Sequence, residues 1–280
     1  MTKKNEKNDL IIWVTANEKY FDFAAIYPIF ALKSNPNAIV EIGLLDIQKF
    51  QKKYNHIIDF YNKYYFEKVF FTPLENKKGI IPTSYRFLHQ PINKAKYLYI
   101  GDIDILITED IITPHLENMK RNKLDFSNKR RGSLEVLTGL HFIEYDKMYP
   151  LNIPNDLDLK KYQDEALLFY LMKKKGYKIP DKDSHKFRPI LGIHASYFNR
   201  PMLPTKTIGD EIVSYPSWYD TLSDDTENLD IFKKYLIIKQ SPELISFFKH
   251  VRSNDVKIRQ IIQTVDLLAY FIVSTNFKIK

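Results

Sequence analysis

Short apolar runs alternate with segments of helical periodicity along the first hundred residues of this chain. Residues 10–16, 38–45 and 67–72 are apolar runs of strand length, and residues 20–33 and 47–61 repeat apolar side chains at helical spacing. Strands that alternate with helices are typical of a parallel sheet. We therefore expect an α/β fold with a Rossmann-like, mostly parallel central sheet flanked by helices.

The pattern beyond residue 80 is less regular. We predict a helical segment over residues 82–95, strands over 125–127 and 137–145, and a helix over 162–176. Residues 192–198 have the pattern of a further strand or loop. Residues 205–228 are rich in turn-forming and acidic residues, and residues 229–280 have the pattern of two or three helices. This change predicts a first domain over residues 1–204, which carries the site, and a helical C-terminal extension over residues 205–280.

The composition excludes several kinds of site. The 280 residues include no cysteine, so disulfides, zinc–thiolate sites and a cysteine nucleophile are excluded. No apolar stretch approaches the roughly 18 residues of a membrane span, and the run at residues 10–14 is too short for the core of a signal peptide. We expect a soluble, cytoplasmic protein.

The chain carries a net charge of +8 at pH 7. Such an excess suits nucleic acid, an anionic lipid surface or a polyanionic substrate, or it is simply a solvated surface. The lysines occur in short runs such as residues 173–175, with no nucleic-acid-binding motif beside them, and we expect no nucleic-acid partner. Some of the many aromatic rings could line a sugar or base pocket, because apolar ring faces suit stacking.

Two aspartates follow an apolar run near the middle of the chain. Residues 96–108 have the pattern of a buried strand that ends at Asp102 and Asp104. Alternation along a strand would send both carboxylates to one side, where burial and repulsion are costly unless a cation compensates them. Oxygen ligands suit Mg²⁺ or Mn²⁺, which keep open positions for phosphate oxygens. The pattern favours a metal site for a phosphorylated ligand; the alternative is two solvated carboxylates in a turn.

Loops that follow different strands converge at one edge of a parallel sheet. Residues 15–17 follow the first predicted strand, and Asp102 and Asp104 follow a later one, so we expect them to border one cleft. Arg86 could bind a phosphate or the aspartates through its planar, permanently charged guanidinium, or it could be a surface residue.

Four further side chains are candidates for the chemistry. Asp164 and Glu165 lie in the first turn of a predicted helix, where the helix dipole favours acids and where a rigid carboxylate could act as a base. His194 could complete a metal shell, but a histidine in an apolar setting is more often a buried residue with a satisfied hydrogen bond. The same two interpretations apply to His141.

Together these motifs resemble nucleotide-sugar glycosyltransferases of the GT-A fold, and distantly those of glycosyltransferase family eight, the bacterial galactosyl- and glucosyltransferases. The resemblance spans residues 10–200. It covers the family's first nucleotide-binding loop at residues 13–20, its tyrosine-arginine step at 85–86 and its D-x-D element at 99–104. It also covers the threonine-glycine strand at 137–141, the carboxylate element at 163–165 and the late histidine at 192–194.

The resemblance implies a role for each matching residue. It implies a site for Mn²⁺ or Mg²⁺ whose ligands are Asp102, Asp104 and His194. It implies that the nucleotide-sugar is bound by Thr15, Ala16, Asn17, Tyr20, Arg86, Asp102 and Ile103. It implies acceptor contacts from Thr138, Gly139 and His141, and catalysis by Gln163, Asp164 and Glu165.

The sequence departs from the family's pattern in four places. Asn17 stands where the family has an aspartate, and Gly101 is an extra residue before the D-x-D element. The lysine-proline-tryptophan that follows the late histidine is absent, since Ala-Ser-Tyr-Phe follows His194, so the family's diphosphate lysine has no counterpart. The carboxylate-rich element is shifted toward Asp164 and Glu165, which leaves open whether the anomeric configuration is retained or inverted.

The implied activity is metal-dependent transfer of a sugar from a UDP-sugar to a hydroxyl of a bacterial surface glycan, either capsule or lipooligosaccharide. The acceptor would be a glycan or a lipid-linked molecule. One alternative is a sugar-phosphate nucleotidyltransferase. Such enzymes have a glycine-rich loop after the first strand, and residues 15–19 do not form one. Another is a non-catalytic polyanion-binding protein.

The C-terminal helices have two interpretations. They either cap the first domain or attach the protein peripherally to the inner membrane, where a lipid-linked acceptor would lie. The second interpretation rests on basic residues among apolar ones, at Lys233, Lys234, Lys239, Lys249, Arg252, Lys257 and Arg259.

Overall fold

The computed structural model describes residues 8–77, 79–131, 134–151, 153, 157–159, 162–181, 191–195, 205–208, 211–214 and 226–277. Six strands form the central sheet in the order β3-β2-β1-β4-β7-β6. Their bounds are β1 Leu10–Ala16, β2 Ala38–Leu44, β3 Val69–Pro73, β4 Tyr97–Ile100, β6 Phe126–Ser127 and β7 His141–Glu144. The first four strands are parallel, and β7 runs antiparallel to β4 and β6. The prediction of a mostly parallel sheet is confirmed.

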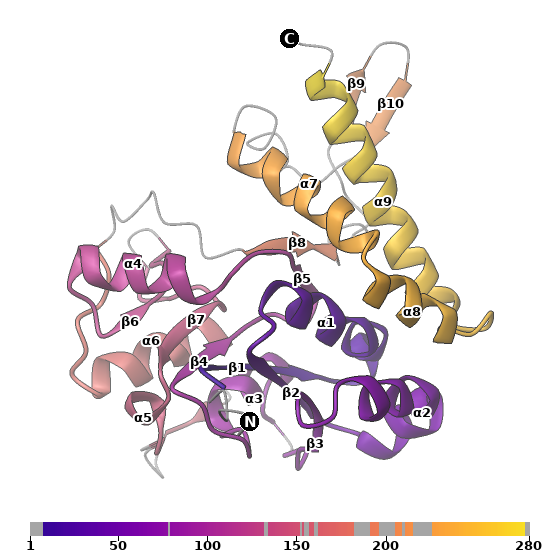
Figure 1. Cartoon of the computed structure of the whole chain (residues 1–280). Helices are drawn as coiled ribbons and strands as arrows, with labels where there is room; N and C mark the ends of the chain where they lie inside the picture. Colours follow the sequence, from indigo (N-terminus) through magenta and orange to yellow (C-terminus); the bar gives the residue numbers. More distant parts are fainter. Residues whose placement is uncertain are drawn as a thin grey trace, which may run out of the picture.

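Helices cover both faces of this sheet (Figure 1). In the central strand β1, Ile12 and Val14 enter one hydrophobic core, while Ile11 and Trp13 enter a second core on the other face. The first core includes residues of α1 (Phe21–Ser34) and α2 (Ile47–Tyr64). The second is closed by α3 (Tyr85–Leu88), α5 (Tyr145–Met148) and α6 (Asp164–Lys174). The unbroken apolar run of β1 thus follows from burial on both sides.

The prediction of two or three C-terminal helices is confirmed: the structure has α7 (Thr226–Lys239), α8 (Pro242–His250) and α9 (Val256–Phe277). They pack on the α1 and α2 side of the sheet and share its core (Figure 1). The rings of Phe30 and Tyr235 stack at 5.8 Å, and those of Phe60 and Phe247 meet edge to face at 5.3 Å. No helix in the described ranges is both long and apolar enough to cross a bilayer.

Two antiparallel strands, β9 (Thr205–Ile208) and β10 (Glu211–Ser214), lie in the region predicted to be rich in turns. The domain boundary predicted near residue 204 falls outside the described residues. That division of the chain therefore stays a prediction.

The helix predicted over residues 82–95 is wrong beyond its first half. The 3-10 turn η2 (Pro82–Ser84) and α3 end at Leu88. The carboxylate of Glu41, buried in β2, instead accepts the backbone N–H groups of Ile92 and Asn93 at 2.8 and 3.0 Å. These bonds satisfy a buried charge, and they fix the bend of the chain at Ile92 and Asn93.

The strand predicted over residues 137–145 is also too long, because β7 begins at His141. Before it, the side chain of Asn128 holds the chain, accepting from the backbone N–H of Thr138 at 3.0 Å and donating to the carbonyl of Thr138 at 3.0 Å. The backbone adds only a single antiparallel bridge here, between Arg130 and Leu137, so this stretch does not continue the strand.

The strand predicted across residues 96–108 is broken at the two aspartates. The strand β4 ends at Ile100, residues 101–104 turn, and β5 (Ile105–Ile107) pairs antiparallel with β8 (Gly192–His194) in a separate two-stranded sheet. At Gly101 a Cβ atom would lie 2.8 Å from Cε1 of Tyr99, so a glycine is needed where the chain turns. The positions of the Asp102 and Asp104 side chains are therefore set by this turn and not by the alternation of side chains along a strand.

Two fully buried histidines, His115 in α4 (Ile112–Asn122) and His141, make stability depend on pH. Burial lowers the pKa of each to about 3. The unfolded pKa is about 6.5, so below it the unfolded chain binds more protons. We expect full stability from these groups above pH 6.5, and a loss of up to about 1.4 kcal/mol per pH unit for each as the pH falls toward 3.

Urea denaturation between pH 7.5 and 4.5 measures this slope. The variant His141→Gln should show a shallower fall of the unfolding free energy than the unchanged chain. The variant Asn55→Gln, at an exposed position of α2 that carries no titrating group, is the control and should keep the slope. Equal slopes in all three proteins would contradict the prediction.

Candidate functional site

Arg86 joins two acids that are distant in the sequence. Its guanidinium is almost fully buried and forms ion pairs with Asp102, in the turn after β4, and with Asp164, the first residue of α6, at 2.9 Å. It also donates to the carbonyl of Gly101 at 3.0 Å. Arg86 is positioned by its own neighbours, since Tyr85 and Phe87 are buried and its carbonyl accepts from the indole N–H of Trp13 at 2.9 Å.

The charges of this cluster stabilise one another. Burial alone lowers the pKa of Arg86, but the carboxylates of Asp102 and Asp164 outweigh burial and raise it. Burial alone raises the pKa of Asp102, but the adjacent Arg86 guanidinium outweighs it and holds that pKa below its usual value. The cluster therefore stays ionised at neutral pH, with Arg86 charged and Asp102 a carboxylate.

Gly139 lies against this cluster. A Cβ atom there would lie 2.5 Å from Nη2 of Arg86 and 3.3 Å from Oδ1 of Asp102. A side chain at this position would push the guanidinium off its two acids. The segment predicted to touch the acceptor thus borders the Arg86 cluster directly.

Glu165 is held beside the same cluster by a residue that the sequence did not single out. Arg131 Nη2 lies 2.7 Å from Oε1 of Glu165. Burial raises the pKa of Glu165, while Arg131 works in the opposite direction. Arg131 lies in the polar loop between two predicted strands. A charged residue in such a loop is a common feature of binding sites, and this feature could have identified Arg131 from the sequence. Gln163 occupies the N-cap position of α6 and is exposed.

Asp104 and His194 form a second pair near the first. Their Oδ1 and Nε2 atoms lie 3.6 Å apart, and both side chains are mostly buried. The backbone holds them in place, because Ile105 pairs with His194 and Ala195 donates to the carbonyl of Asp104 at 2.8 Å. The predicted proximity of Asp104 and His194 is present. Ile103, between the two aspartates, is buried in the core.

The donor set fits Mn²⁺ or Mg²⁺ in part. Carboxylate oxygen and imidazole nitrogen suit these ions, which take further ligands from phosphate and water. Asp104 and His194 are in place, whereas Asp102 is paired with Arg86 and its side chain is 30% exposed. Across the part of the chain that the structure describes, no three His, Asp or Glu side chains gather closely enough to hold an ion by themselves.

The predicted nucleotide loop lies at the carboxyl end of β1. Asn17 is the N-cap of the 3-10 turn η1 (Glu18–Tyr20), and its side chain accepts from the backbone N–H of Lys19 at 3.2 Å. Thr15 is half-buried, and the carbonyl of Ala16 accepts from Leu45 at 3.1 Å. Since β1 and β4 are parallel neighbours, this loop and the turn at Asp102 leave the sheet at the same edge.

The predicted acceptor residues Thr138 and His141 meet at Asn128. The hydroxyl of Thr138 donates to Oδ1 of Asn128 at 2.7 Å, and Nδ2 of Asn128 lies 3.3 Å from Nδ1 of His141. His141 is fully buried, whereas Thr138 is half-buried. Contact of these residues with an acceptor stays a prediction.

Neither the protein-family models nor the curated proteins compared with this chain match it. Among solved structures, the chain is similar to the glycosyltransferase GlyE of Streptococcus pneumoniae TIGR4, with 14% identity and a TM-score of 0.44 over 62% of this chain and 45% of that one. It is similar to the galactosyltransferase LgtC in complex with donor and acceptor sugar analogs, with 12% identity and a TM-score of 0.36 over 61% of this chain and 67% of that one.

It is also similar to the bifunctional glycosyltransferase WbbM, with 11% identity and a TM-score of 0.37 over 86% of this chain and 51% of that one. This chain thus spans less than half of the GlyE chain and about half of the WbbM chain. All three are structures of glycosyltransferases.

Proposed function

We propose that this chain transfers a sugar from a UDP-sugar to a hydroxyl of a bacterial surface glycan. The observation that carries the proposal is the Arg86 cluster, which joins the turn after β4 to the first residue of α6 through two ion pairs. It puts a permanent cation and a rigid carboxylate side by side at the sheet edge where open α/β sheets bind ligands. An arginine fork suits diphosphate, and a nearby carboxylate suits the carbon that loses it.

Mn²⁺ or Mg²⁺ would be held by Asp104 and His194, with Asp102 as a third ligand. When bound, the ion would supply Lewis-acid stabilisation of the charge that grows on the departing UDP. Arg86 can share this task, because a guanidinium released from Asp102 still carries its charge to the diphosphate oxygens. Thr15, Ala16, Asn17 and Tyr20 would position the uridine, with Ile103 beside them.

Asp164 and Glu165 are the groups that would act at the anomeric carbon. Burial raises the pKa of Glu165, which makes it a better proton acceptor than an ordinary glutamate. In an inverting reaction its carboxylate would remove the proton from the acceptor hydroxyl. In a retaining reaction the Asp164 carboxylate would stabilise an oxocarbenium-like state from the opposite face. Gln163, Thr138, Gly139 and His141 complete the proposed acceptor side.

Substitution of both aspartates tests the donor site. In the double variant Asp102→Asn with Asp104→Asn, we expect the rise in melting temperature caused by UDP and Mn²⁺ to disappear, because a ligand stabilises the folded chain only as far as it binds it. We expect sugar transfer to fall by at least about 100-fold, the scale of losing the groups that stabilise the leaving charge. Differential scanning fluorimetry and release of UDP from UDP-sugars measure the two effects.

The control for this pair is Asp59→Asn, an exposed aspartate of α2. It should keep both the UDP response and the transfer. A chain that releases pyrophosphate from UTP and a sugar phosphate is a nucleotidyltransferase, and that result would replace the proposal. A double variant with the full UDP response would also contradict it.

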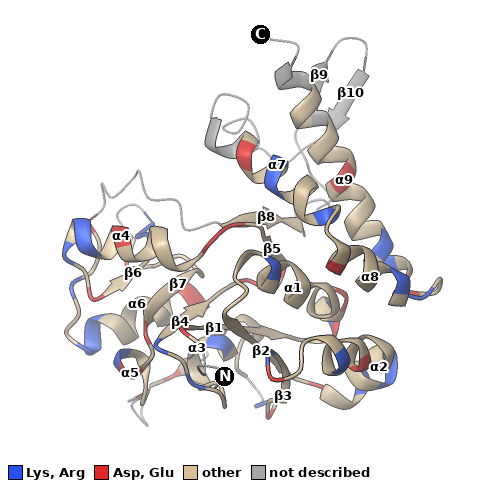
Figure 2. Ribbon diagram, viewed as in Figure 1, with Lys and Arg blue, Asp and Glu red and all other residues tan. Residues whose placement is uncertain are grey.

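We also place the acceptor at a membrane surface. Ile245 in α8 and Val256 at the start of α9 are exposed, and so are Lys249, one helical turn after Ile245, and Lys257, next to Val256. Lys234 and Lys239 point elsewhere, into ion pairs with Glu109 and Asp266. Lys and Arg are spread over several helices rather than gathered on one (Figure 2).

Sedimentation with vesicles of anionic phospholipid tests this attachment. The double variant Ile245→Ser with Val256→Ser should lose most of the sedimented fraction, because the apolar contact is removed while the charge stays. An unchanged fraction would remove the membrane from the proposal. Truncation is a poor alternative, because α7, α8 and α9 share the core of α1 and α2.

A further inference from the structure

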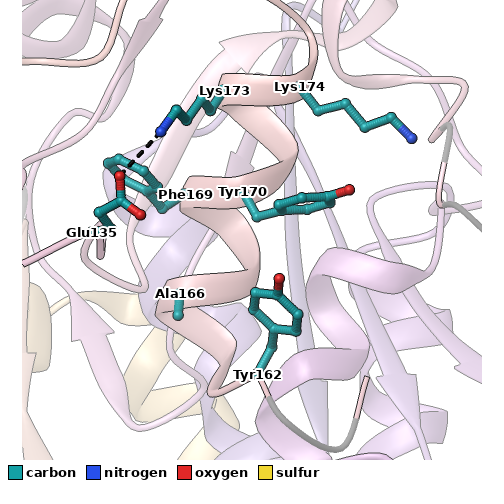
Figure 3. Close-up of a pocket in the computed structure, with 7 residues that line it drawn as sticks. All are labelled: Glu135, Tyr162, Ala166, Phe169, Tyr170, Lys173 and Lys174. Carbon is teal, nitrogen blue, oxygen red and sulfur yellow. Dashed lines mark hydrogen bonds and ion pairs between the residues drawn. The ribbon is translucent and has the colours of Figure 1, made fainter. Parts of the chain in front are cut away.

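A pocket of about 470 Å³ lies on the outer side of α6 (Figure 3). Ala166, Phe169, Tyr170, Lys173 and Lys174 line it from the helix itself. These residues follow the spacing i, i+3, i+4, i+7 and i+8, so they belong to one helix face. Tyr162, before the helix, and Glu135, from another loop, close its sides. The volume is within the range of small-ligand sites.

This face is separate from the Arg86 cluster. Asp164 is two residues before Ala166, and two residues turn an α-helix by about 200°. The opposite face of α6 enters the core through Leu167, Leu168 and Leu171. A molecule in the pocket would therefore not touch Asp164. Glu165 is one helical turn before Phe169 and does not line the pocket, so it lies at the border between the two sites.

Aromatic rings make the floor and one wall of the pocket. The rings of Tyr162 and Tyr170 lie 5.6 Å apart at 46°, and Figure 3 shows both rings on the same side of α6. Both tyrosines are half-buried, so ring surface and hydroxyl are partly exposed together. Such a ring offers an electron-rich face to C–H groups and a hydroxyl to polar neighbours, a combination that suits a sugar ring.

Charges at the rim favour an anionic ligand. Lys173 lies 3.0 Å from Glu135 and 5.8 Å from the centre of the Phe169 ring, and the guanidinium of Arg130 lies 5.6 Å from the same ring. Lys174 adds a second lysine to the lining, and Figure 3 shows its amine on the side of α6 away from Glu135. The pair of Lys173 and Glu135 is 63% and 68% exposed, so it is weak and can rearrange around a ligand.

We propose that this pocket binds a saccharide that carries a carboxylate or a phosphate, as a second glycan site apart from the donor site. The tyrosines would stack on the sugar ring, the lysines would pair with its anionic group, and Glu135 would accept bonds from its hydroxyls. A carboxylate in the lining suits the hydroxyl groups of a sugar. The inference goes beyond the proposed function and does not depend on it.

Calorimetric titration of the full chain in EDTA, without nucleotide, tests the site. The probes are trigalacturonate, maltotriose that carries one phosphate, neutral maltotriose and hexauridylate. We expect at least one acidic saccharide to bind about tenfold more tightly than maltotriose, the scale of one charge-assisted hydrogen bond. The two acidic probes distinguish carboxylate from phosphate recognition.

The variant Tyr170→Ala should weaken the acidic saccharide about tenfold, the scale of a lost aromatic contact, while Tyr170→Phe should stay within about threefold. The matched controls are Tyr64→Ala and Lys63→Gln, an exposed tyrosine and a lysine 5.0 Å from its ring on α2. They should bind as the unchanged chain does. If Tyr170→Ala does not fold, the double variant Lys173→Gln with Lys174→Gln should remove the preference for acidic over neutral saccharide.

Three results would overturn the inference: no acidic saccharide binds, binding is unchanged in Tyr170→Ala or in the lysine pair, or hexauridylate binds with the same dependence on Tyr170. Binding of the acidic saccharide by a chain that does not bind UDP would refute the proposed function and leave the second site intact. The reverse pattern would refute the second site alone.

Discussion

Replacement of Arg86 by alanine is expected to lower the free energy of unfolding by about 2–3 kcal/mol and to abolish sugar transfer. The guanidinium is buried and pairs with Asp102 and Asp164, so its removal leaves two carboxylates without a counter-charge. A fully buried broken pair costs more, but the Asp102 and Asp164 side chains are 30% and 21% exposed, and water screens them.

Chemical denaturation over a range of pH measures this effect and its cause. Arg86 holds the pKa of Asp102 below its usual value, so the stabilisation is present above pH 4 and is lost as the pH falls and Asp102 becomes protonated. The difference between the unchanged chain and Arg86→Ala should therefore shrink at low pH. Arg86→Lys keeps the charge but not the fork, and it should lose less stability than Arg86→Ala.

The matched control is Arg121→Ala, an exposed arginine in the last turn of α4, with an expected change within about 0.5 kcal/mol. An Arg86→Ala protein that is as stable as this control would show that the cluster does not contribute to stability. A variant that still transfers sugar would remove Arg86 from the proposed site.

Replacement of Gly192 by alanine is expected to cost about 1–3 kcal/mol and to abolish the response to UDP and Mn²⁺. A Cβ atom at Gly192 would collide with the backbone carbonyl of Leu106, which no side-chain rotation can relieve. The strands β5 and β8 would have to separate, and His194 would move with β8 away from Asp104.

Thermal shift with UDP and Mn²⁺, beside urea denaturation, measures both effects of Gly192→Ala. The control is Gly176→Ala, after α6, where a Cβ atom meets nothing within 4 Å but φ is +76°. That variant should lose about 1 kcal/mol from backbone strain and keep the UDP response. A Gly192→Ala protein with an intact UDP response would contradict the proposed role of the Asp104 and His194 pair.

The sequence by itself determined the elements whose pattern is local. The strand predicted at 10–16 is β1, and the predicted helix over 47–61 is the first part of α2, because a run of apolar side chains or a helical repeat is complete within one segment. It also identified Arg86, Asp102, Asp104, Asp164 and His194 as candidates, since charged residues stand out in apolar surroundings.

Only the tertiary structure decided which of these residues meet. Arg86 is 16 residues from Asp102 and 78 from Asp164, and a loop arginine, Arg131, reaches Glu165. The need for a glycine at position 101 likewise depends on the ring of Tyr99. The strand β5 depends on its pairing with β8, which is about ninety residues further along the chain. Periodicity describes how one segment is buried, whereas these contacts arise when the packing of the sheet brings separate segments to one edge.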